Sequence, residues 1–217
     1  MTRSDRKKNN RKSLVICNGD VLSKKAIAPL LTGRPFIICA DGGANKARRL
    51  GVRPDVIIGD LDSITSGTKA FFSSVMTLHN ADQESTDLEK ALTYLVKHRF
   101  RQTVVVGATG GRPDHSLANL SILKKYHKKI EIVFTDQFCT TQIIRNQIIF
   151  EAAVGSVVSL MPLGACEGIA TVGLKYPLHR EALELGVREG TSNEVVSTPV
   201  KISVKKGSLL LFVVKKT

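Results

Sequence analysis

Short apolar runs that alternate with helical patterns constrain the fold of this chain more than any other feature. Most of the runs are rich in β-branched residues and lack polar alternation, and they cover residues 14–17, 36–40, 56–59, 103–107 and 130–134. Continuous apolar strands of this kind are typical of a parallel sheet that is buried on both faces. Strands that alternate with helices form βαβ units with right-handed crossovers. We therefore predict a three-layer α/β domain with a mostly parallel sheet.

The clearest helical pattern covers residues 87–98, where apolar residues from Leu88 to Val96 recur on one face. Thr86 and Glu89 form a capping-box pattern that would start this helix. A weaker apolar stripe through Leu117, Leu120 and Leu123 predicts a helix over residues 114–127. Shorter helices are expected over residues 24–31 and 44–50.

The pattern changes near residue 145. Beyond it, apolar runs cover residues 147–153, 156–161, 169–173, 194–200 and 208–214, and glycine, proline and polar turns separate them. This profile is typical of a small antiparallel β-sandwich. We predict three parts: a basic, flexible extension over residues 1–13, an α/β domain over 14–145 and a β-sandwich over 146–217.

The net charge of +13 raises the question of nucleic-acid binding. Residues 1–13 hold six basic side chains and one acidic one, which gives +5, and other basic clusters lie scattered within 124–129 and 201–216. Few aromatic residues accompany them, since the chain has no Trp and 3 Tyr, so platforms for stacking bases are scarce. We expect a solvated basic surface that attracts anionic substrates such as ATP, and no nucleic-acid partner.

The cysteines and the apolar segments indicate the compartment. The four cysteines are widely spaced and form no CxxC pair: Cys17, Cys39, Cys139 and Cys166. They are expected to be reduced thiols, as in cytosolic proteins. No apolar stretch approaches the roughly 18 residues of a membrane span, and the basic N-terminus lacks a signal-peptide core. The expected location is the cytoplasm, without a membrane partner.

Two acidic loops directly follow predicted strands, where ligands collect in open α/β sheets. Asp41, Gly42 and Gly43 come after residues 36–40, and Asp60-Leu61-Asp62 comes after 56–59. Closely spaced carboxylates beside a strand end are a common way to hold Mg²⁺ near phosphates. Taken alone, the first loop is equally compatible with an ordinary strand-to-helix turn, and the second with a solvated turn.

Two further loops open predicted helices. Asp87 stands at a helix N-terminus, a position that the helix dipole alone would explain. Gly110 and Gly111 precede another helix, where backbone N–H groups could bind phosphate and Arg112 could bind it in a bidentate manner. His115 could equally be a surface histidine. The chain contains neither GxGxxG nor GxxxxGK[ST], which disfavours Rossmann dinucleotide and Walker-A sites.

Taken together and in order, these motifs closely resemble the thiamine pyrophosphokinase family. The likeness continues in residues 173–178 (GLKYPL) and in Ser192-Asn193-Glu194, and it covers nearly the whole chain from about residue 14. The resemblance implies an α/β catalytic domain followed by a β-sandwich. It also implies an enzyme that transfers a diphosphate from ATP to the hydroxyl of thiamine and leaves AMP.

The resemblance also implies roles for particular residues. The expected ligands of Mg²⁺, beside the ATP phosphates, are Asp41, Asp60, Asp62 and Asp87. The expected ATP-binding residues are Asp41, Gly42, Gly110, Gly111, Arg112 and His115. The expected catalytic residues are Asp60, Asp62, Asp87, Arg112 and Asp114, with Asp114 near the substrate alcohol. Thiamine would contact Gln83, Ser192 and Asn193 at a site shared by two subunits, which implies a homodimer.

Two other functions are compatible with part of the sequence. A diphosphokinase of the same fold could act on another alcohol, such as a pterin, through the same acidic loops. The motifs at 173–178 and 192–194 count against it, because such an enzyme would not need a thiamine-binding sandwich. A basic nucleic-acid-binding protein is the alternative from a different class, and it would leave the aspartates without a role.

Overall fold

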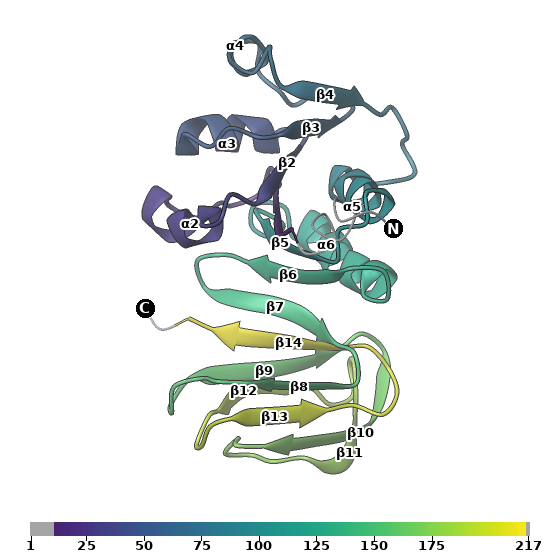
Figure 1. Cartoon of the computed structure of the whole chain (residues 1–217). Helices are drawn as coiled ribbons and strands as arrows, with labels where there is room; N and C mark the ends of the chain where they lie inside the picture. Colours follow the sequence, from purple (N-terminus) through teal and green to yellow (C-terminus); the bar gives the residue numbers. More distant parts are fainter. Residues whose placement is uncertain (1–10, 216–217) are drawn as a thin grey trace, which may run out of the picture. The chain divides into compact units, whose positions relative to one another are not determined.

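The computed structural model describes residues 11–215, and its chain divides into two units (Figure 1). The first unit runs to Ile122 and includes Lys129–Gln137; the second comprises Leu123–Lys128 and the chain from Phe138 onward. Residues 1–10 of the predicted basic extension lie outside the described residues. Its last residue, Ser13, already belongs to the first strand.

The first unit contains a sheet of six parallel strands, as the apolar runs predict. Their spatial order is β6-β5-β1-β2-β3-β4. All residues of β1 and β3 are buried, which agrees with their lack of polar alternation. The edge strand β4 was not predicted, because most of its side chains are exposed and its apolar pattern is weak. The strands are β1 (Ser13–Ile16), β2 (Phe36–Ala40), β3 (Val56–Gly59), β4 (Met76–His79), β5 (Gln102–Val106) and β6 (Glu131–Thr135).

Helices cover both faces of this sheet (Figure 1). Ile27 of α2 and Ala44 of α3 join Leu14, Ile16 and Cys39 in one buried cluster on one face. Helix α5 packs against β2 and β3 from the other face. The predicted three-layer arrangement is therefore confirmed. The helices are α2 (Lys24–Leu31), α3 (Gly43–Leu50), α4 (Ser66–Phe71), α5 (Asp87–Lys97) and α6 (Pro113–Tyr126).

Helix α5 begins where the capping-box pattern places it. The Oγ1 atom of Thr86 accepts a hydrogen bond from the backbone N–H of Glu89 at 3.2 Å. Leu88, Leu92 and Leu95 are buried along its apolar face. The cap and the buried face together fix the first turn of this helix.

The predicted apolar stripe of α6 is wrong at Leu117, which is 66% exposed, although Leu123 is buried. The first half of this helix is mostly exposed, so Leu117 is not covered by the residues that the structure describes. The buried residues instead come from its second half, where Ile122 and Tyr126 accompany Leu123.

The second unit consists of two antiparallel four-stranded sheets, ordered β12-β9-β14-β7 and β11-β10-β13-β8. Both contribute to one buried cluster, with Val158 and Leu209 from the first sheet and Ile169 and Ile202 from the second. A shared core between two sheets is the β-sandwich that the sequence predicts. The strands are β7 (Cys139–Ile144), β8 (Gln147–Phe150), β9 (Val157–Pro162), β10 (Ala165–Val172), β11 (His179–Glu184), β12 (Gly190–Glu194), β13 (Val200–Ser203) and β14 (Leu209–Val214).

The predicted single strand over residues 194–200 is wrong. Strand β12 ends at Glu194, which pairs with Val157 in one sheet, and β13 begins at Val200, which pairs with Phe150 in the other. The segment between them therefore connects the two sheets and cannot belong to one strand. The sequence analysis also missed β11, which carries three charged side chains in six residues.

The four cysteines are unpaired, as predicted. Cys17, Cys39 and Cys166 are buried and Cys139 is half-buried. Burial raises the pKa of Cys17 to about 12, so its thiol stays protonated and unreactive at neutral pH. Among residues 11–215, no helix is long and apolar enough to cross a membrane.

The buried face of α5 yields a prediction for stability. Leu92 is fully buried, so Leu92→Ala should leave a cavity and lower the free energy of unfolding by about 2–5 kcal/mol. Leu117→Ala, the same change at an exposed site, should alter it by less than about 0.5 kcal/mol. Urea unfolding followed by circular dichroism measures both values. Equal losses in the two variants would contradict this packing.

Candidate active site

A cavity of about 650 Å³ opens in the first unit at the carboxyl ends of the parallel strands. The loops after β1, β2, β3 and β5 line it, together with the start of α5. Along the sheet, strand order reverses between β1 and β5. Ligands of open α/β sheets bind at such reversal points, so the topology alone marks this cavity as a binding site.

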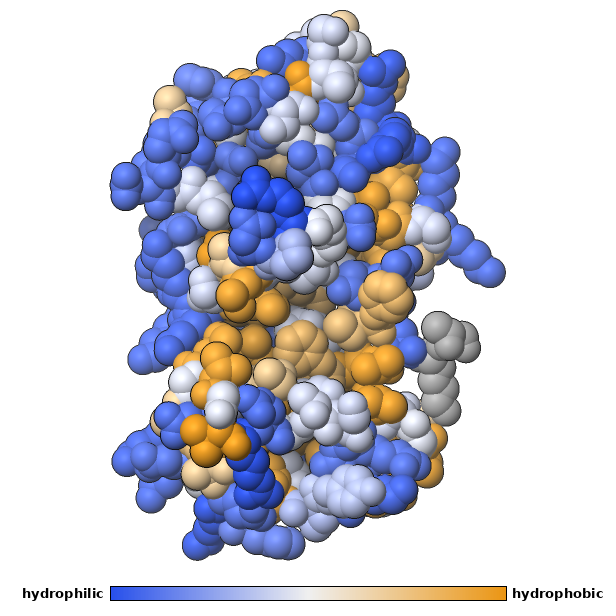
Figure 2. All heavy atoms as spheres, turned by 180° about the vertical axis from the view of Figure 1, so that it is seen from behind, coloured by the Kyte–Doolittle hydropathy of each residue, from blue (hydrophilic) through white to orange (hydrophobic). Residues whose placement is uncertain are grey.

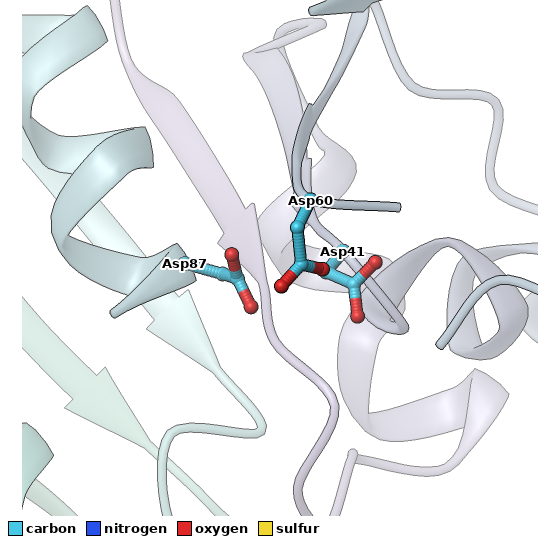
Figure 3. A group of neighbouring side chains, drawn as sticks. All are labelled: Asp41, Asp60 and Asp87. Carbon is cyan, nitrogen blue, oxygen red and sulfur yellow. The ribbon is translucent and has the colours of Figure 1, made fainter. Parts of the chain in front are cut away.

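Three carboxylates meet in the cavity. Asp41 follows β2, Asp60 follows β3 and Asp87 starts α5, and each offers an oxygen atom within 4.8 Å of the other two (Figure 3). The three side chains point toward one another from separate elements. We name this set the aspartate triad. Such a triad offers the oxygen ligands that a hard divalent cation requires.

Asp41 is the most constrained member of the triad. Its backbone has a φ of 42°, a left-handed conformation that costs a non-glycine residue of order 1–3 kcal/mol. The residue is only 4% exposed, and its Oδ1 atom has no hydrogen-bond partner among the described residues. A strained, buried carboxylate with an unpartnered oxygen indicates a ligand-binding role.

Gly59 makes the triad sterically possible. Its φ is 153°, and a Cβ atom there would lie 2.8 Å from the Cβ of Asp41 and 3.0 Å from Oδ1 of Asp87. Any side chain would therefore push two of the three carboxylates apart. Gly59 thus allows the backbone before Asp60 to lie close to Asp41 and Asp87, in addition to allowing the bend that the sequence suggests.

The side chain of Asn45, on α3, holds the loop after Asp60 through two hydrogen bonds to its backbone. Asn45 donates from Nδ2 to the carbonyl of Ser63 at 2.8 Å and accepts at Oδ1 from the backbone N–H of Thr65 at 3.1 Å. Asn45 was not predicted, although it follows the Asp41-Gly42-Gly43 loop by only two residues. Asp62 lies outside the triad and accepts a hydrogen bond from the hydroxyl of Ser63 at 2.8 Å.

Asp87 has an unusual electrostatic environment. Burial and the neighbouring Asp41 and Asp60 raise its pKa, while Lys90 opposes that rise. The Nζ atom of Lys90 lies 3.1 Å from Oδ1 of Asp87, and the lysine side chain is only 3% exposed. Lys90 was not predicted; a lysine three residues after an aspartate on an amphipathic helix is the signal that could have indicated this pair.

The glycine-rich loop after β5 is tied to the loop after β1. The backbone N–H of Asp20 donates to the carbonyl of Thr109, and that of Gly19 donates to the carbonyl of Gly107, both at 2.9 Å. Gly110 has a φ of 88° and packs against the Asp20 carboxylate, where a side chain would not fit. Asn119 donates from Nδ2 to the carbonyl of Ala108 at 2.7 Å. Neither Asp20 nor Asn119 was predicted, although both line the cavity.

Arg112 and Asp114 form a two-point ion pair. The Nε atom of Arg112 lies 3.1 Å from Oδ1 of Asp114, and an η nitrogen lies 2.5 Å from Oδ2. Both side chains are exposed, and the hydrogen bonds from Arg112 hold the pKa of Asp114 below its usual range. Arg112 lines the cavity with Gly110, Gly111, His115 and Gln83. Asp114 and Gly42 are not among its lining residues; Gly42 caps the N-terminus of α3.

Ser192 and Asn193 belong to the second unit, on β12. The side chain of Asn193 accepts from the backbone N–H of Tyr176 at 3.1 Å and donates to the carbonyl of Tyr176 at 2.7 Å. It therefore fixes the loop over residues 173–178. Ser192 is exposed with a φ of 55°, and its backbone N–H donates to the hydroxyl of Ser159 at 2.9 Å.

Two family profiles match most of the chain. The profile described as "Thiamin pyrophosphokinase, catalytic domain" matches residues 27–134, and "Thiamin pyrophosphokinase, vitamin B1 binding domain" matches residues 145–209. The chain belongs to the thiamine pyrophosphokinase family. The family resemblance expected from the motifs is thereby confirmed.

Individual members of the family align over nearly the whole chain. Thiamine pyrophosphokinase 1 of Arabidopsis thaliana is 31% identical over 240 aligned residues, which cover 95% of this chain and 88% of that protein. Thiamine pyrophosphokinase of Bacillus subtilis is 28% identical over 198 residues, covering 86% of this chain and 92% of that protein.

Solved structures of the family share this fold. The crystal structure of thiamine pyrophosphokinase from Bacillus subtilis superposes with a TM-score of 0.82 at 24% identity, covering 94% of this chain and 100% of that one. Thiamin pyrophosphokinase from Candida albicans superposes with a TM-score of 0.86 at 17% identity, covering 96% and 90%. The predicted order of an α/β domain followed by a β-sandwich is confirmed.

The aspartate triad yields a prediction about cations. Asp60→Asn removes one of three mutually repelling charges, so it should raise the thermal midpoint of the cation-free protein by about 2–4 °C for each kcal/mol of repulsion relieved. Mn²⁺ should raise the midpoint of the unmodified protein and raise that of the variant much less. Differential scanning fluorimetry with and without EDTA measures both effects.

Glu131→Gln is the matched control, because Glu131 is exposed and begins β6, at the amino ends of the parallel strands and away from the triad at their carboxyl ends. It should respond to Mn²⁺ as the unmodified protein does. An Asp60→Asn protein that retained the full response would contradict a cation site at the triad.

Proposed function

We propose that this protein is a thiamine pyrophosphokinase, which transfers a diphosphate from ATP to the hydroxyl of thiamine and releases AMP. The observation that carries the proposal is the aspartate triad in a cavity at the strand-order reversal, within the region that matches the family's catalytic domain. The match of residues 145–209 to the vitamin B1 binding domain supports thiamine as the acceptor. In this proposal the first unit binds ATP and the second contributes to the thiamine site.

The triad residues Asp41, Asp60 and Asp87 fit a Mg²⁺ ion. The unpartnered Oδ1 of Asp41 supports this assignment, because a buried carboxylate oxygen needs a proton or a cation beside it. When bound, Mg²⁺ would neutralise phosphate charge and polarise the phosphorus that the alcohol attacks. Asp62, two residues after Asp60 in the same loop, stays a predicted fourth ligand.

The glycine-rich loop and the start of α6 are suited to hold the phosphates. Gly111 has a positive φ and open space beside it, so an anion could approach its backbone, while Gly110 lets the loop pack closely against Asp20. Arg112 and His115 line the same cavity and can donate hydrogen bonds to phosphate oxygens. The N-terminus of α3, capped by Gly42, would add backbone N–H groups near Asp41. Positioning and charge neutralisation of this kind supply most of the catalysis in phosphoryl transfer.

Asp114 is best suited to positioning rather than to proton abstraction. A carboxylate held by two hydrogen bonds from Arg112 has a lowered pKa and is a weak base. By holding the guanidinium, Asp114 keeps Arg112 oriented until phosphate oxygens compete for it. We therefore assign to Asp114 the orientation of Arg112.

The thiamine site would combine Gln83 of one subunit with Ser192 and Asn193 of its partner in a homodimer. The second unit exposes several large apolar side chains, among them Val172, Tyr176 and Val187. On the face drawn in Figure 2, hydrophobic patches lie among hydrophilic residues. Exposed apolar surface of this kind supports an interface between copies of the chain.

An assay with purified protein tests the reaction. With ATP, Mg²⁺ and thiamine, the protein should form AMP and thiamine diphosphate in equal amounts, as followed by chromatography. EDTA should abolish both products. AMP formation with a hydroxymethyl pterin but not with thiamine would replace this proposal by the pterin alternative.

Mixing two inactive variants tests the shared site. Asp60→Asn disables the first unit, and Ser192→Arg should block the thiamine contact without unfolding the chain, because Ser192 is exposed. Statistical re-association gives one intact site in half of the dimers, so the mixture should recover about a quarter of the unmodified activity. Each variant alone should remain inactive. No recovery after verified subunit exchange would contradict a site built from two subunits.

A further inference from the structure

Lys90 is a buried cation directly beside the aspartate triad, and none of the functions described so far uses it. Its side chain is 3% exposed, and the residue lines the cavity. Removing an ammonium group from water costs several kcal/mol unless a partner compensates it. The charge is therefore held at this position by a specific interaction, and the interaction is with Asp87.

The contact leaves the two oxygens of Asp87 in different situations. Oδ1 accepts a hydrogen bond from Nζ of Lys90 at 3.1 Å and also lies against Gly59. The carboxylate as a whole points from the start of α5 toward Asp60 (Figure 3). Holding Oδ1 from one side fixes the rotation of the carboxylate, and Oδ2 takes no part in this contact.

Helix geometry makes this support rigid. Residues three apart on a helix lie on the same face, so Lys90 reaches Asp87 along α5. The helix is anchored by the Thr86 cap and by its buried leucines. Lys90 therefore holds Asp87 from within the same anchored helix.

We propose that Lys90 is a positioning residue of the cation site: it holds Oδ1 of Asp87 so that the carboxylate faces Asp41 and Asp60 in the orientation that binds a divalent cation. The inference rests on the cation site of the proposed function. It predicts that Lys90 acts on cation binding through Asp87 and not through its charge. The two mechanisms differ in sign, because removal of a nearby positive charge alone would strengthen the binding of a cation.

The test measures Mn²⁺ binding by isothermal titration calorimetry on the full chain without ATP or thiamine. Lys90→Met should weaken Mn²⁺ binding about tenfold, the usual effect of removing a group that orients a metal ligand. Lys97→Met, on the exposed last turn of the same helix, should leave binding unchanged. Unchanged or tighter binding in Lys90→Met would overturn the proposal.

A double-mutant cycle separates positioning from a general effect on the fold. In the Asp87→Asn background, Lys90→Met should cause no further loss of Mn²⁺ binding, because the oriented carboxylate is already gone. An equal loss in both backgrounds would overturn the proposal. Thermal melting verifies that each variant is folded. If Lys90→Met does not fold, Lys90→Gln provides the same comparison, with a smaller expected loss because it keeps a hydrogen-bond donor.

The same titration distinguishes this inference from the proposed reaction. An unmodified protein that binds Mn²⁺ but forms no thiamine diphosphate would overturn the reaction and leave the role of Lys90 intact. An unmodified protein that binds no Mn²⁺ would overturn the inference about Lys90.

Discussion

The mutual repulsion of three carboxylates is the constraint on which the catalytic unit depends. At the distance that separates the oxygens of Asp41, Asp60 and Asp87, two full charges repel by roughly 3 kcal/mol at an effective dielectric constant of about 20. A protein that keeps three such groups together without a ligand is less stable than it could be. The surrounding structure must therefore hold them in place, and a bound cation would remove the repulsion.

The fold holds the three carboxylates together with buried strands and helices and with a glycine where a side chain would separate them. Parallel strands that are buried on both faces bring Asp41 and Asp60 to the same edge of the sheet. Gly59 removes the side chain that would separate them, and Asn45 pins the loop that follows. Lys90 supports the third carboxylate from within α5. Each support comes from a different element, so the site depends on the packing of the whole unit.

The sequence was sufficient to predict the parts of the fold that depend on local pattern. Apolar runs without alternation predicted the central strands, and the Thr86 cap predicted the start of α5. The local pattern was insufficient where pairing with other strands decides the secondary structure of a segment. Strand β11 is rich in charged residues and is held in the sheet by pairing with β10. Residues 194–200 divide between two sheets because Glu194 pairs with β9 and Val200 pairs with β8, and no local sequence pattern encodes these pairings.

The same distinction holds for the site. Asp41 and Asp60 were predictable because strand ends of a parallel sheet converge, whereas Asp87 starts α5 and its place beside them was expected only from the family resemblance. Asp20 and Asn119 were not predicted, because their positions in the cavity depend on contacts with the separate loop after β5. Lys90 was not predicted either. A lysine on an amphipathic helix is normally solvated, and only the structure shows that Lys90 is buried.

The structure also changes how Asn193 should be understood. Its amide is occupied on both sides by the backbone of Tyr176, and its oxygen also accepts from the N–H of Glu194 at 2.9 Å. A side chain with these bonds already made contributes to a ligand site chiefly by shaping the neighbouring loop. Ser192, exposed and held in a left-handed conformation, remains available to a ligand. If thiamine is the acceptor, its recognition in the second unit therefore depends on the shape of the loop over residues 173–178 as much as on hydrogen bonds.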